Sequence, residues 1–223
     1  EVGCGSGILL YKLSNKYKDL NFEGIEPFGE GFSSLEKINL IIKDSGININ
    51  HISFERLNTS SKYDLIFCIN VFEHLNDWRN FISRSLTLLK ENGKLVILSP
   101  NYNFPFESHF SIPIIKNKSL TFKIFKNHIK NFEKNKNLIG LWESLNFVKK
   151  SEVKRFLKKI KHKERFEILD DTNIIEFMID RINYDNEFKK RNKLLGIFGL
   201  ILRKIKILKI IKIFPNYLPY MKL

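Results

Sequence analysis

The feature that most constrains this chain is its opening run, Glu1-Val2-Gly3-Cys4-Gly5-Ser6-Gly7, in which three alternating glycines follow a carboxylate. Glycines at this spacing allow a strand to turn sharply into a helix while a ligand lies against bare backbone. The run is therefore typical of a nucleotide-type cofactor loop. Such a loop normally follows a buried strand, and only Glu1 and Val2 precede it, so we expect a fragment whose first strand is largely missing.

The composition fits a globular protein whose second half is basic. The 223 residues are 43% hydrophobic, which suits a folded core. Two cysteines, Cys4 and Cys68, are too few for a disulfide framework and fit a reducing cytosol. Residues 1–110 carry 11 Lys and Arg against 13 Asp and Glu, whereas residues 111–223 carry 27 against 11. This excess indicates either a nucleic-acid or anionic-membrane partner, or the compositional drift of a Lys-, Asn- and Ile-rich chain that contains no Ala and no Gln.

Helical and strand patterns alternate over the first hundred residues. Apolar spacing predicts helices at 8–17, 32–43 and 78–89, and strands at 20–25, 47–54, 64–70 and 94–99, with a turn at Asn92-Gly93. The continuous apolar run within 64–70 is typical of a strand buried on both faces. Together these patterns predict an α/β fold with a doubly wound, mostly parallel sheet, which binds ligands outside the carboxyl ends of its strands.

The remainder of the chain has fewer strand signals. Residues 100–113 contain three prolines and many aromatic residues, which favours a loop or lid over a sheet element. Residues 116–165 and 174–182 read as helices, so the C-terminal region should be mostly helical and basic. We therefore divide the chain into a cofactor-binding domain at 1–110, a lid and helical acceptor-side region at 111–187, and a basic, apolar C-terminal segment at 188–223.

The C-terminal segment combines apolar and basic residues. On a helix, Lys206, Lys209 and Lys212 share one side, and the stretch is too often interrupted by charge to supply the roughly 20 apolar residues of a membrane span. We expect an interfacial helix at an anionic membrane surface. A helix docked on its own domain or on a dimer partner is the alternative. The expected location is the cytoplasm, with peripheral attachment to the inner membrane face.

Three further motifs follow the glycine loop along the chain. Glu26 lies nineteen positions after Gly7, at the end of a predicted strand, where a carboxylate can accept hydrogen bonds from ribose hydroxyls. The segments YDLIFCINVFEHL at 63–75 and LLKENGKLVI at 88–97 complete the set. With these motifs, residues 1–110 resemble the class I S-adenosylmethionine (SAM) dependent methyltransferases, which implies a Rossmann-like methyltransferase fold with its first strand truncated.

The resemblance implies SAM as the cofactor and suggests which residues hold it. The glycines of the loop would line the methionine and ribose portions, Glu1 would contact the amino group directly or through water, and Glu26 would bind the ribose. Asn70, at the end of the fourth strand of the family, would lie beside the methionine portion. The expected cofactor-binding residues are thus Glu1, Gly3, Cys4, Gly5, Gly7, Glu26 and Asn70.

Methyl transfer from a sulfonium depends mainly on placing the acceptor in line, and a base helps when the acceptor is a hydroxyl. His109 with Glu107 is our candidate for that base, because both follow the last predicted strand on the side where substrate should enter. The alternative is that His109 packs within an aromatic lid. His74 is expected to cap or orient the turn after the fourth strand. The remaining histidines, His51, His128 and His162, show no metal-ligand spacing, so we expect no metal site.

The sequence predicts a SAM-dependent methyltransferase acting on a small-molecule, lipid-linked or glycan acceptor. An RNA methyltransferase that uses the basic half is one alternative, although the Asn/Asp-Pro-Pro-aromatic motif typical of base-amine enzymes is replaced by Asn70-Val71-Phe72. A non-catalytic interaction protein on the same fold is another. An NAD-type oxidoreductase lacks support, because its glycine spacing and its Tyr-x-x-x-Lys pair are missing from the sequence. The oligomeric state and the acceptor are not encoded in any motif.

Overall fold

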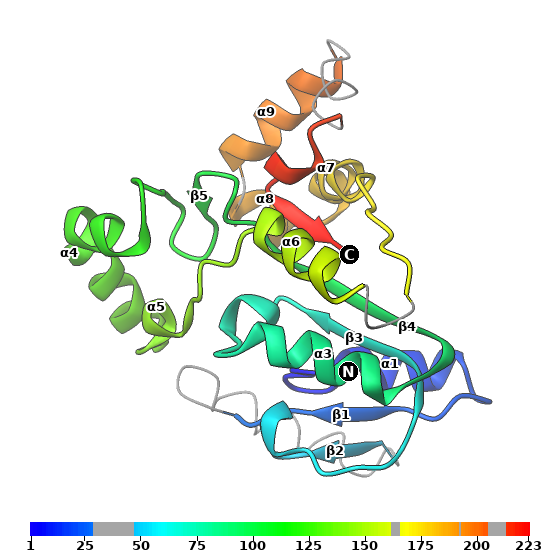
Figure 1. The fold of residues 1–223 in the computed structure, drawn as a ribbon. Helices are drawn as coiled ribbons and strands as arrows, with labels where there is room; N and C mark the ends of the chain where they lie inside the picture. The colour runs from blue at the N-terminus through cyan, green and yellow to red at the C-terminus, as the bar shows by residue number, and fades with distance from the viewer. Residues whose placement is uncertain (29–46, 162–165, 192, 205–212) are drawn as a thin grey trace. The chain divides into compact units, whose positions relative to one another are not determined.

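The computed structural model describes residues 1–28, 47–161, 166–191, 193–204 and 213–223. These residues form two units (Figure 1). The first unit consists of Glu1–Ser99 and Ser108–Asn146, and the second of Pro100–Glu107 and Phe147–Leu223. The division of the chain into 1–110, 111–187 and 188–223 stays a prediction.

The first unit is built on parallel strands that the N-terminal residues join together. Strand β1 (Glu23–Ile25) pairs in parallel with β2 (Asn48–Asn50), and β3 (Tyr63–Ile69) pairs in parallel with β4 (Leu89–Pro100). Val2 forms a parallel bridge to Ile25, and its N–H donates to the Phe67 carbonyl at 2.9 Å. The short segment Glu1–Val2 thus lies between β1 and β3.

Strands β3 and β4 differ from their expected form in two ways. The register runs from Tyr63–Leu89 directly to Leu65–Lys94, so Asn92 and Gly93 lie in a bulge inside β4. The expected turn at these residues is therefore wrong. A Cβ at Gly93 would approach the Tyr63 carbonyl oxygen to 2.8 Å, so the bulge brings two backbones together where a side chain does not fit.

The expectation that β3 is buried on both faces is also wrong. Ile66 and Cys68 are buried on one face of the strand, but Leu65 on the other face is 49% exposed. Alternating side chains point to opposite faces of a strand, so an apolar run does not by itself show that both faces are covered.

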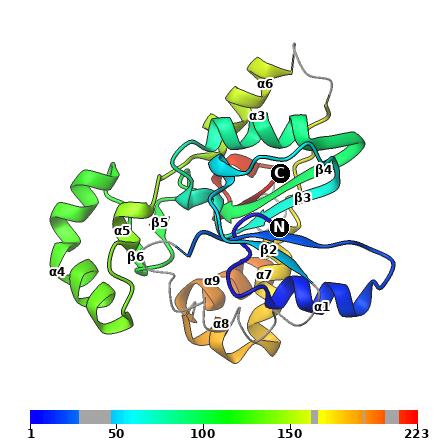
Figure 2. The same cartoon turned by 90° about the horizontal axis from the view of Figure 1, so that it is seen from below.

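Helices lie on opposite sides of this sheet, but they leave Leu65 of β3 about half exposed. Helix α1 (Ile8–Lys16) begins after Gly7 and buries Leu10, while α3 (Trp78–Leu88) begins at Asp77, whose carboxylate accepts a hydrogen bond from the Asn80 N–H at 3.0 Å. Figure 2 shows these two helices on opposite sides of the strands. The buried residues of α3 recur at helical spacing: Trp78, Phe81, Ile82, Ser85 and Leu88.

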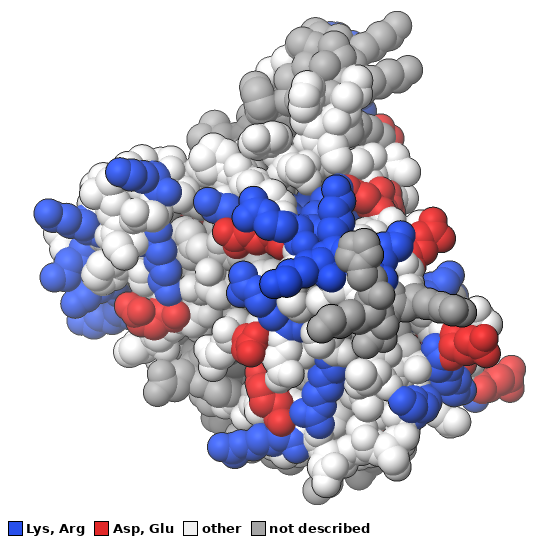
Figure 3. All heavy atoms as spheres, in the orientation of Figure 1, with Lys and Arg blue, Asp and Glu red and all other residues white. Residues whose placement is uncertain are grey.

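The first unit continues beyond the sheet with a short strand and two helices. Strand β6 is Ile112–Pro113, α4 is Lys118–Lys136 and α5 is Leu141–Ser144. The Glu133 carboxylate accepts a hydrogen bond from the Trp142 N–H at 2.8 Å and so ties α5 to α4. Helix α4 exposes a series of lysines: Lys123, Lys126, Lys130, Lys134 and Lys136. Figure 3 shows Lys and Arg side chains gathered on the part of the surface that this helix forms.

The second unit is mainly helical. It contains β5 (Phe106–Glu107), α6 (Lys150–Ile160), α7 (Ile174–Tyr184), α8 (Asn186–Arg191), α9 (Lys193–Lys204) and β7 (Tyr220–Lys222). Helix α9 packs closely on α7, because a Cβ at Gly196 would meet the Ile182 side chain at 2.6 Å. The two-residue strands β5 and β6 correct the expectation that 100–113 contains no sheet element, and β7 was not expected from the sequence.

The expected helix at 32–43 and the lysines placed together at positions 206, 209 and 212 lie outside the described residues. Within the described part of the chain, no helix is both long enough and apolar enough to span a membrane.

Candidate functional site

The glycine loop has the backbone conformation that its sequence predicts. Gly3, Gly5 and Gly7 all have positive φ angles, of 70°, 53° and 76°. At Gly3 a side chain is excluded twice, because residues with a Cβ rarely adopt this φ and because the added Cβ would lie 2.3 Å from Val71 Cγ2. The residues after β3 therefore pack directly against the loop, and only bare backbone fits between them.

Glu1 buries one carboxylate oxygen that is suited to a positively charged ligand. Among the described residues, its Oε2 is buried and has no hydrogen-bond partner. Burial raises the pKa of the Glu1 carboxyl to about 7, and the neighbouring Glu26 carboxylate also acts to raise it. An approaching cation stabilises a buried carboxylate that has few other partners, so this oxygen is a candidate partner for an ammonium group.

Glu26 fixes the loop and faces the same region. It lies at the end of β1 and is 8% exposed. Its Oε2 accepts a hydrogen bond from the Gly5 N–H at 2.8 Å, and its Oε1 accepts one from the Phe28 N–H at 3.0 Å. An ionised carboxylate has about four lone-pair sites, so these two bonds leave acceptor capacity for ligand hydroxyls.

Cys4 lies in the loop as a buried thiol. Burial and the neighbouring Glu1 and Glu26 carboxylates raise its pKa to about 12. Its Sγ lies 2.7 Å from the position of an added Cβ at Gly24, so the thiol points against β1. Cys4 can therefore line a cofactor only with its backbone. Cys68 on β3 is fully buried, and burial raises the pKa of its thiol as well.

Asn70 directly follows β3 and has the left-handed conformation, with φ of 54°. Asparagine tolerates this conformation better than most residues with a Cβ. Its N–H donates to the Leu98 carbonyl at 2.8 Å, which continues the pairing with β4, and its side chain is exposed at the carboxyl end of the strand. This is the edge at which open α/β sheets bind ligands.

The turn after β3 carries a cluster that the sequence did not reveal as a unit. Glu73, His74 and His109 each place one potential ligand atom within 4.8 Å of the others. His109 Nε2 lies 3.9 Å from Glu73 Oε1, and the two imidazole rings are 5.5 Å apart in an edge-on arrangement. The Glu73 side chain is completely buried, and its Oε2 accepts a hydrogen bond from the Ser99 hydroxyl at 3.0 Å.

The structure places His109 and Glu107, the predicted base and its partner, in different units. The structure brings His109 to Glu73, while Glu107 lies in the second unit, where the Tyr102 hydroxyl donates to its Oε1 at 3.3 Å. The joint role of His109 and Glu107 therefore stays a prediction. Glu73 is the acid that sequence reasoning missed, although it stands beside His74 in the EHL motif, directly after a buried strand.

The residues of the loop fit SAM. Its α-ammonium group matches the buried Glu1 oxygen, its ribose hydroxyls match the remaining acceptor capacity of Glu26, and the missing side chain at Gly3 permits close approach. The match rests on the chemistry of these groups and on the clash that a Cβ at Gly3 would make with Val71.

Comparisons with known proteins agree with this fit. A family model described as "Methyltransferase domain" matches residues 1–152. An uncharacterised protein of Mycobacterium tuberculosis strain H37Rv is 28% identical over 190 residues, which are 84% of this chain and 64% of that protein. A ubiquinone biosynthesis O-methyltransferase of Rickettsia conorii is 28% identical over 103 residues, 45% of this chain and 34% of that enzyme. The chain thus spans less than two thirds of the length of these relatives.

Solved structures show the same fold. The plantazolicin methyltransferase BamL, in complex with a triazolic desmethylPZN analogue and S-adenosylhomocysteine (SAH), is similar over 99% of this chain and 73% of its own, with a TM-score of 0.54 and 14% identity. The plantazolicin methyltransferase BpumL in complex with SAH is similar over 86% of this chain and 68% of its own, with a TM-score of 0.52 and 14% identity. The predicted α/β methyltransferase fold is confirmed. Because the family model covers more than half of its residues, the chain belongs to the methyltransferase domain family, in the SAM-dependent class that its motifs resemble.

Proposed function

We propose that the protein to which this chain belongs transfers a methyl group from SAM to a small-molecule, lipid-linked or glycan acceptor. The observation that carries the proposal is the glycine loop, where the buried Glu1 Oε2 has no hydrogen-bond partner among the described residues. Polar groups are rarely buried without a partner, so such an atom beside a bare backbone loop is best explained by a ligand that binds there.

The chain's own residues supply the binding groups. Glu1 accepts a hydrogen bond from the α-ammonium group, Glu26 accepts hydrogen bonds from the ribose hydroxyls, and the backbone of Gly3 to Gly7 lines the remainder. Asn70, at the carboxyl end of β3, lies beside the methionine portion. When bound, SAM supplies an electrophilic methyl group whose leaving group is the neutral thioether of SAH.

The acceptor must lose a proton if it is a hydroxyl. We propose that His109 Nε2 accepts this proton, and that the Glu73 carboxylate, 3.9 Å away, stabilises the resulting imidazolium. A contribution of Glu107 to the same step remains part of the proposal. Because in-line placement supplies most of the catalysis, loss of the base should reduce the rate without abolishing it.

An RNA acceptor is the second candidate function. It is favoured by the exposed lysines of α4, which could contact a phosphate backbone (Figure 3). The C-terminal segment supports a different partner, an anionic membrane surface. Helix α9 packs on α7 through its glycines and exposes apolar side chains elsewhere, with Ile197 and Ile201 each about half exposed. We retain the membrane as the proposed docking surface and the cytoplasmic face as the proposed location.

Two measurements on the full-length protein test this function. Calorimetry with SAH should show binding at about one site per chain, reduced in Glu26→Ala and unchanged in Glu91→Ala, an exposed acid on β4. Transfer of a radiolabelled methyl group from SAM to separated lipid, glycan, RNA and protein fractions identifies the acceptor. Absence of SAH binding by the folded protein rejects the proposal, and label in the RNA fraction alone replaces the proposed acceptor by the second candidate.

A further inference from the structure

The cluster of Glu73, His74 and His109 has the composition of a metal site. Two imidazoles and one carboxylate are a common set of three protein ligands for zinc and related transition-metal ions, which leave further coordination positions open. All three residues lie in the first unit, so their arrangement does not depend on the placement of the second.

The spacing of the ligand atoms is closer to that of a metal site than to that of a hydrogen-bonded pair. The 3.9 Å between His109 Nε2 and Glu73 Oε1 is too long for a hydrogen bond. Two ligands bound to one ion at about 2.1 Å lie roughly 3.4 Å apart in tetrahedral geometry. Since all three ligand atoms are within 4.8 Å of one another, side-chain rotations that shorten the separations by at most about 1.4 Å are enough to close the site.

Neighbouring residues orient two of the ligands. The Ser144 hydroxyl lies 2.8 Å from the Leu141 carbonyl oxygen and 2.8 Å from His74 Nδ1. In the tautomer with the proton on Nδ1, His74 donates to Ser144 and the lone pair of the neutral ring is on Nε2. Metal-binding histidines are commonly held in this way by a hydrogen bond from the other nitrogen.

The carboxylate is held in the same manner. Glu73 Oε2 accepts the hydrogen bond of Ser99, which leaves Oε1 as the oxygen nearest His109. The Asn146 side chain donates to the carbonyls of Phe72 and Leu75, each at 2.9 Å, and so fixes the turn that carries Glu73 and His74. The cluster is thus a supported arrangement on a short 3-10 turn, rather than a chance meeting of surface side chains.

We propose that Glu73, His74 and His109 bind a divalent transition-metal ion of the zinc type. The inference goes beyond the proposed function, because metal binding can be measured without cofactor or acceptor. It also changes the expected role of His109, which serves as a ligand in the metal-bound protein. A bound cation then lowers the pKa of an acceptor hydroxyl directly, so the class of acceptor favoured by this site is a hydroxyl.

Cobalt is a suitable probe, because Co²⁺ bound to histidines absorbs visible light in a way that aqueous Co²⁺ does not. The full-length protein, purified with chelator and dialysed, should develop this absorption at one Co²⁺ per chain. Zn²⁺ should displace it, whereas Mg²⁺ should not, because Mg²⁺ prefers an all-oxygen site. Absence of the band, or its loss on addition of Mg²⁺, overturns the proposal.

Variants assign the ligands. His109→Gln and Glu73→Gln should each lower the affinity for Co²⁺ at least tenfold, while His51→Ala, which removes an exposed imidazole elsewhere in the first unit, should leave it unchanged. Ser144→Ala keeps all three ligands and should weaken binding about tenfold through the lost orientation of His74. A circular-dichroism melt checks that each variant is folded, and retention of the full cobalt band in folded His109→Gln contradicts the site.

Separate readouts keep the two proposals distinguishable. SAH calorimetry of the metal-free protein reports on the glycine loop, and the cobalt spectrum reports on the cluster. Binding of SAH without cobalt leaves the proposed function intact and rejects the metal site, whereas cobalt binding without SAH binding does the reverse.

Discussion

The glycine loop of the first unit and the polar network of the second unit both bury charged and polar groups, but they satisfy them differently. In the second unit, the buried Asn101 makes four side-chain hydrogen bonds: its oxygen accepts from the Asn103 and Lys150 N–H groups, and its nitrogen donates to the Asn216 and Leu218 carbonyls. The loop, in contrast, leaves Glu1 Oε2 buried without a partner among the described residues. Asn101 is fully hydrogen-bonded and holds its surroundings together, although the buried Asn216 Oδ1 in the same network has no partner among the described residues. The unpaired Glu1 oxygen differs because it lies beside a bare backbone loop, where a ligand can bind.

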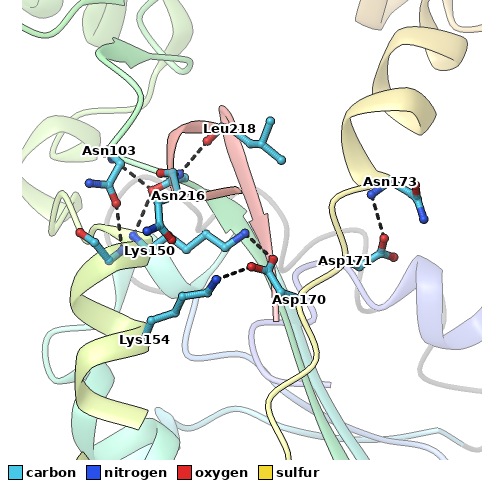
Figure 4. A network of polar contacts seen from close by, with 10 residues as sticks. Asn103, Lys150, Lys154, Asp170, Asp171, Asn173, Asn216 and Leu218 are labelled. Carbon is cyan, nitrogen blue, oxygen red and sulfur yellow. Dashed lines mark hydrogen bonds and ion pairs between the residues drawn. The ribbon is translucent and has the colours of Figure 1, made fainter. Parts of the chain in front are cut away.

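Lys150, whose backbone N–H donates to Asn101, has its charge paired as well. Lys150 is fully buried, and burial lowers the pKa of its amine while the Asp170 carboxylate acts in the opposite direction. Its Nζ donates to Asp170 Oδ1 at 2.5 Å, and Lys154 pairs with the other oxygen of the same carboxylate (Figure 4). Each buried charge therefore has an opposite charge beside it, which is the condition for burying ions at a tolerable cost.

The largest expected effect is on the stability of the region around Asn101. Asn101→Ala removes four hydrogen bonds and leaves buried N–H and C=O groups unpaired, so we expect a loss of about 4 kcal/mol in the free energy of unfolding. Urea unfolding followed by circular dichroism measures it. Asn15→Ala, at an exposed position on α1, is the matched control and should change stability little. A loss below about 1 kcal/mol for Asn101→Ala would show that the hydrogen bonds of Asn101 contribute little to the stability of the second unit.

A smaller loss of stability, joined to a loss of binding, is expected in the loop. Gly3→Ala forces a Cβ into the left-handed region and against Val71, and the combined cost should be about 3 kcal/mol. SAH affinity should fall more than tenfold in calorimetry. Val71→Ala in the same chain removes both γ-methyl contacts and should recover part of the stability but not the backbone strain. Full recovery would mean that the close contact, and not the backbone conformation, requires glycine here.

The smallest expected effect is a pH dependence of the affinity for SAH, which arises from the unpaired carboxylate oxygen of Glu1. With its pKa raised to about 7, the Glu1 carboxyl is about one tenth ionised at pH 6 and nine tenths ionised at pH 8. Only the ionised form attracts the α-ammonium of SAH, so affinity should rise up to about tenfold between these pH values. Glu1→Ala should bind more weakly at pH 8 and lose most of this rise. An equal slope in both proteins would show that another group titrates.

The features that follow from local chemistry were predictable from the sequence. The loop conformation, the acid at the end of β1, helix α1 and helix α3 each depend on residue type at fixed spacing, and the structure shows them. The bulge at Asn92-Gly93 was mistaken for a turn, because the same dipeptide serves either purpose and only pairing with β3 decides. The short strand β7 depends on partners far away in the sequence, which local patterns do not contain.

The candidate site was predictable to a similar extent. Glu1, Glu26 and Asn70 stand at strand ends that periodicity locates, whereas the meeting of Glu73 with His109 needs the chain to fold back after β4. Ser99 and Ser144 could not be assigned a role from sequence, since their contribution is a hydrogen bond to a residue more than twenty positions away. Local spacing thus indicated the cofactor loop but not the cluster beside it.

The placement of the two thiols has a practical consequence. Cys4 and Cys68, the only cysteines of the chain, are both buried in the first unit, and their raised pKa values keep them as unreactive thiols near neutral pH. An alkylating reagent can therefore modify them only when the first unit opens, and the second unit contributes no signal. The protein carries its own label for the opening of the cofactor loop, and ligands that close this loop can be recognised by the protection they confer.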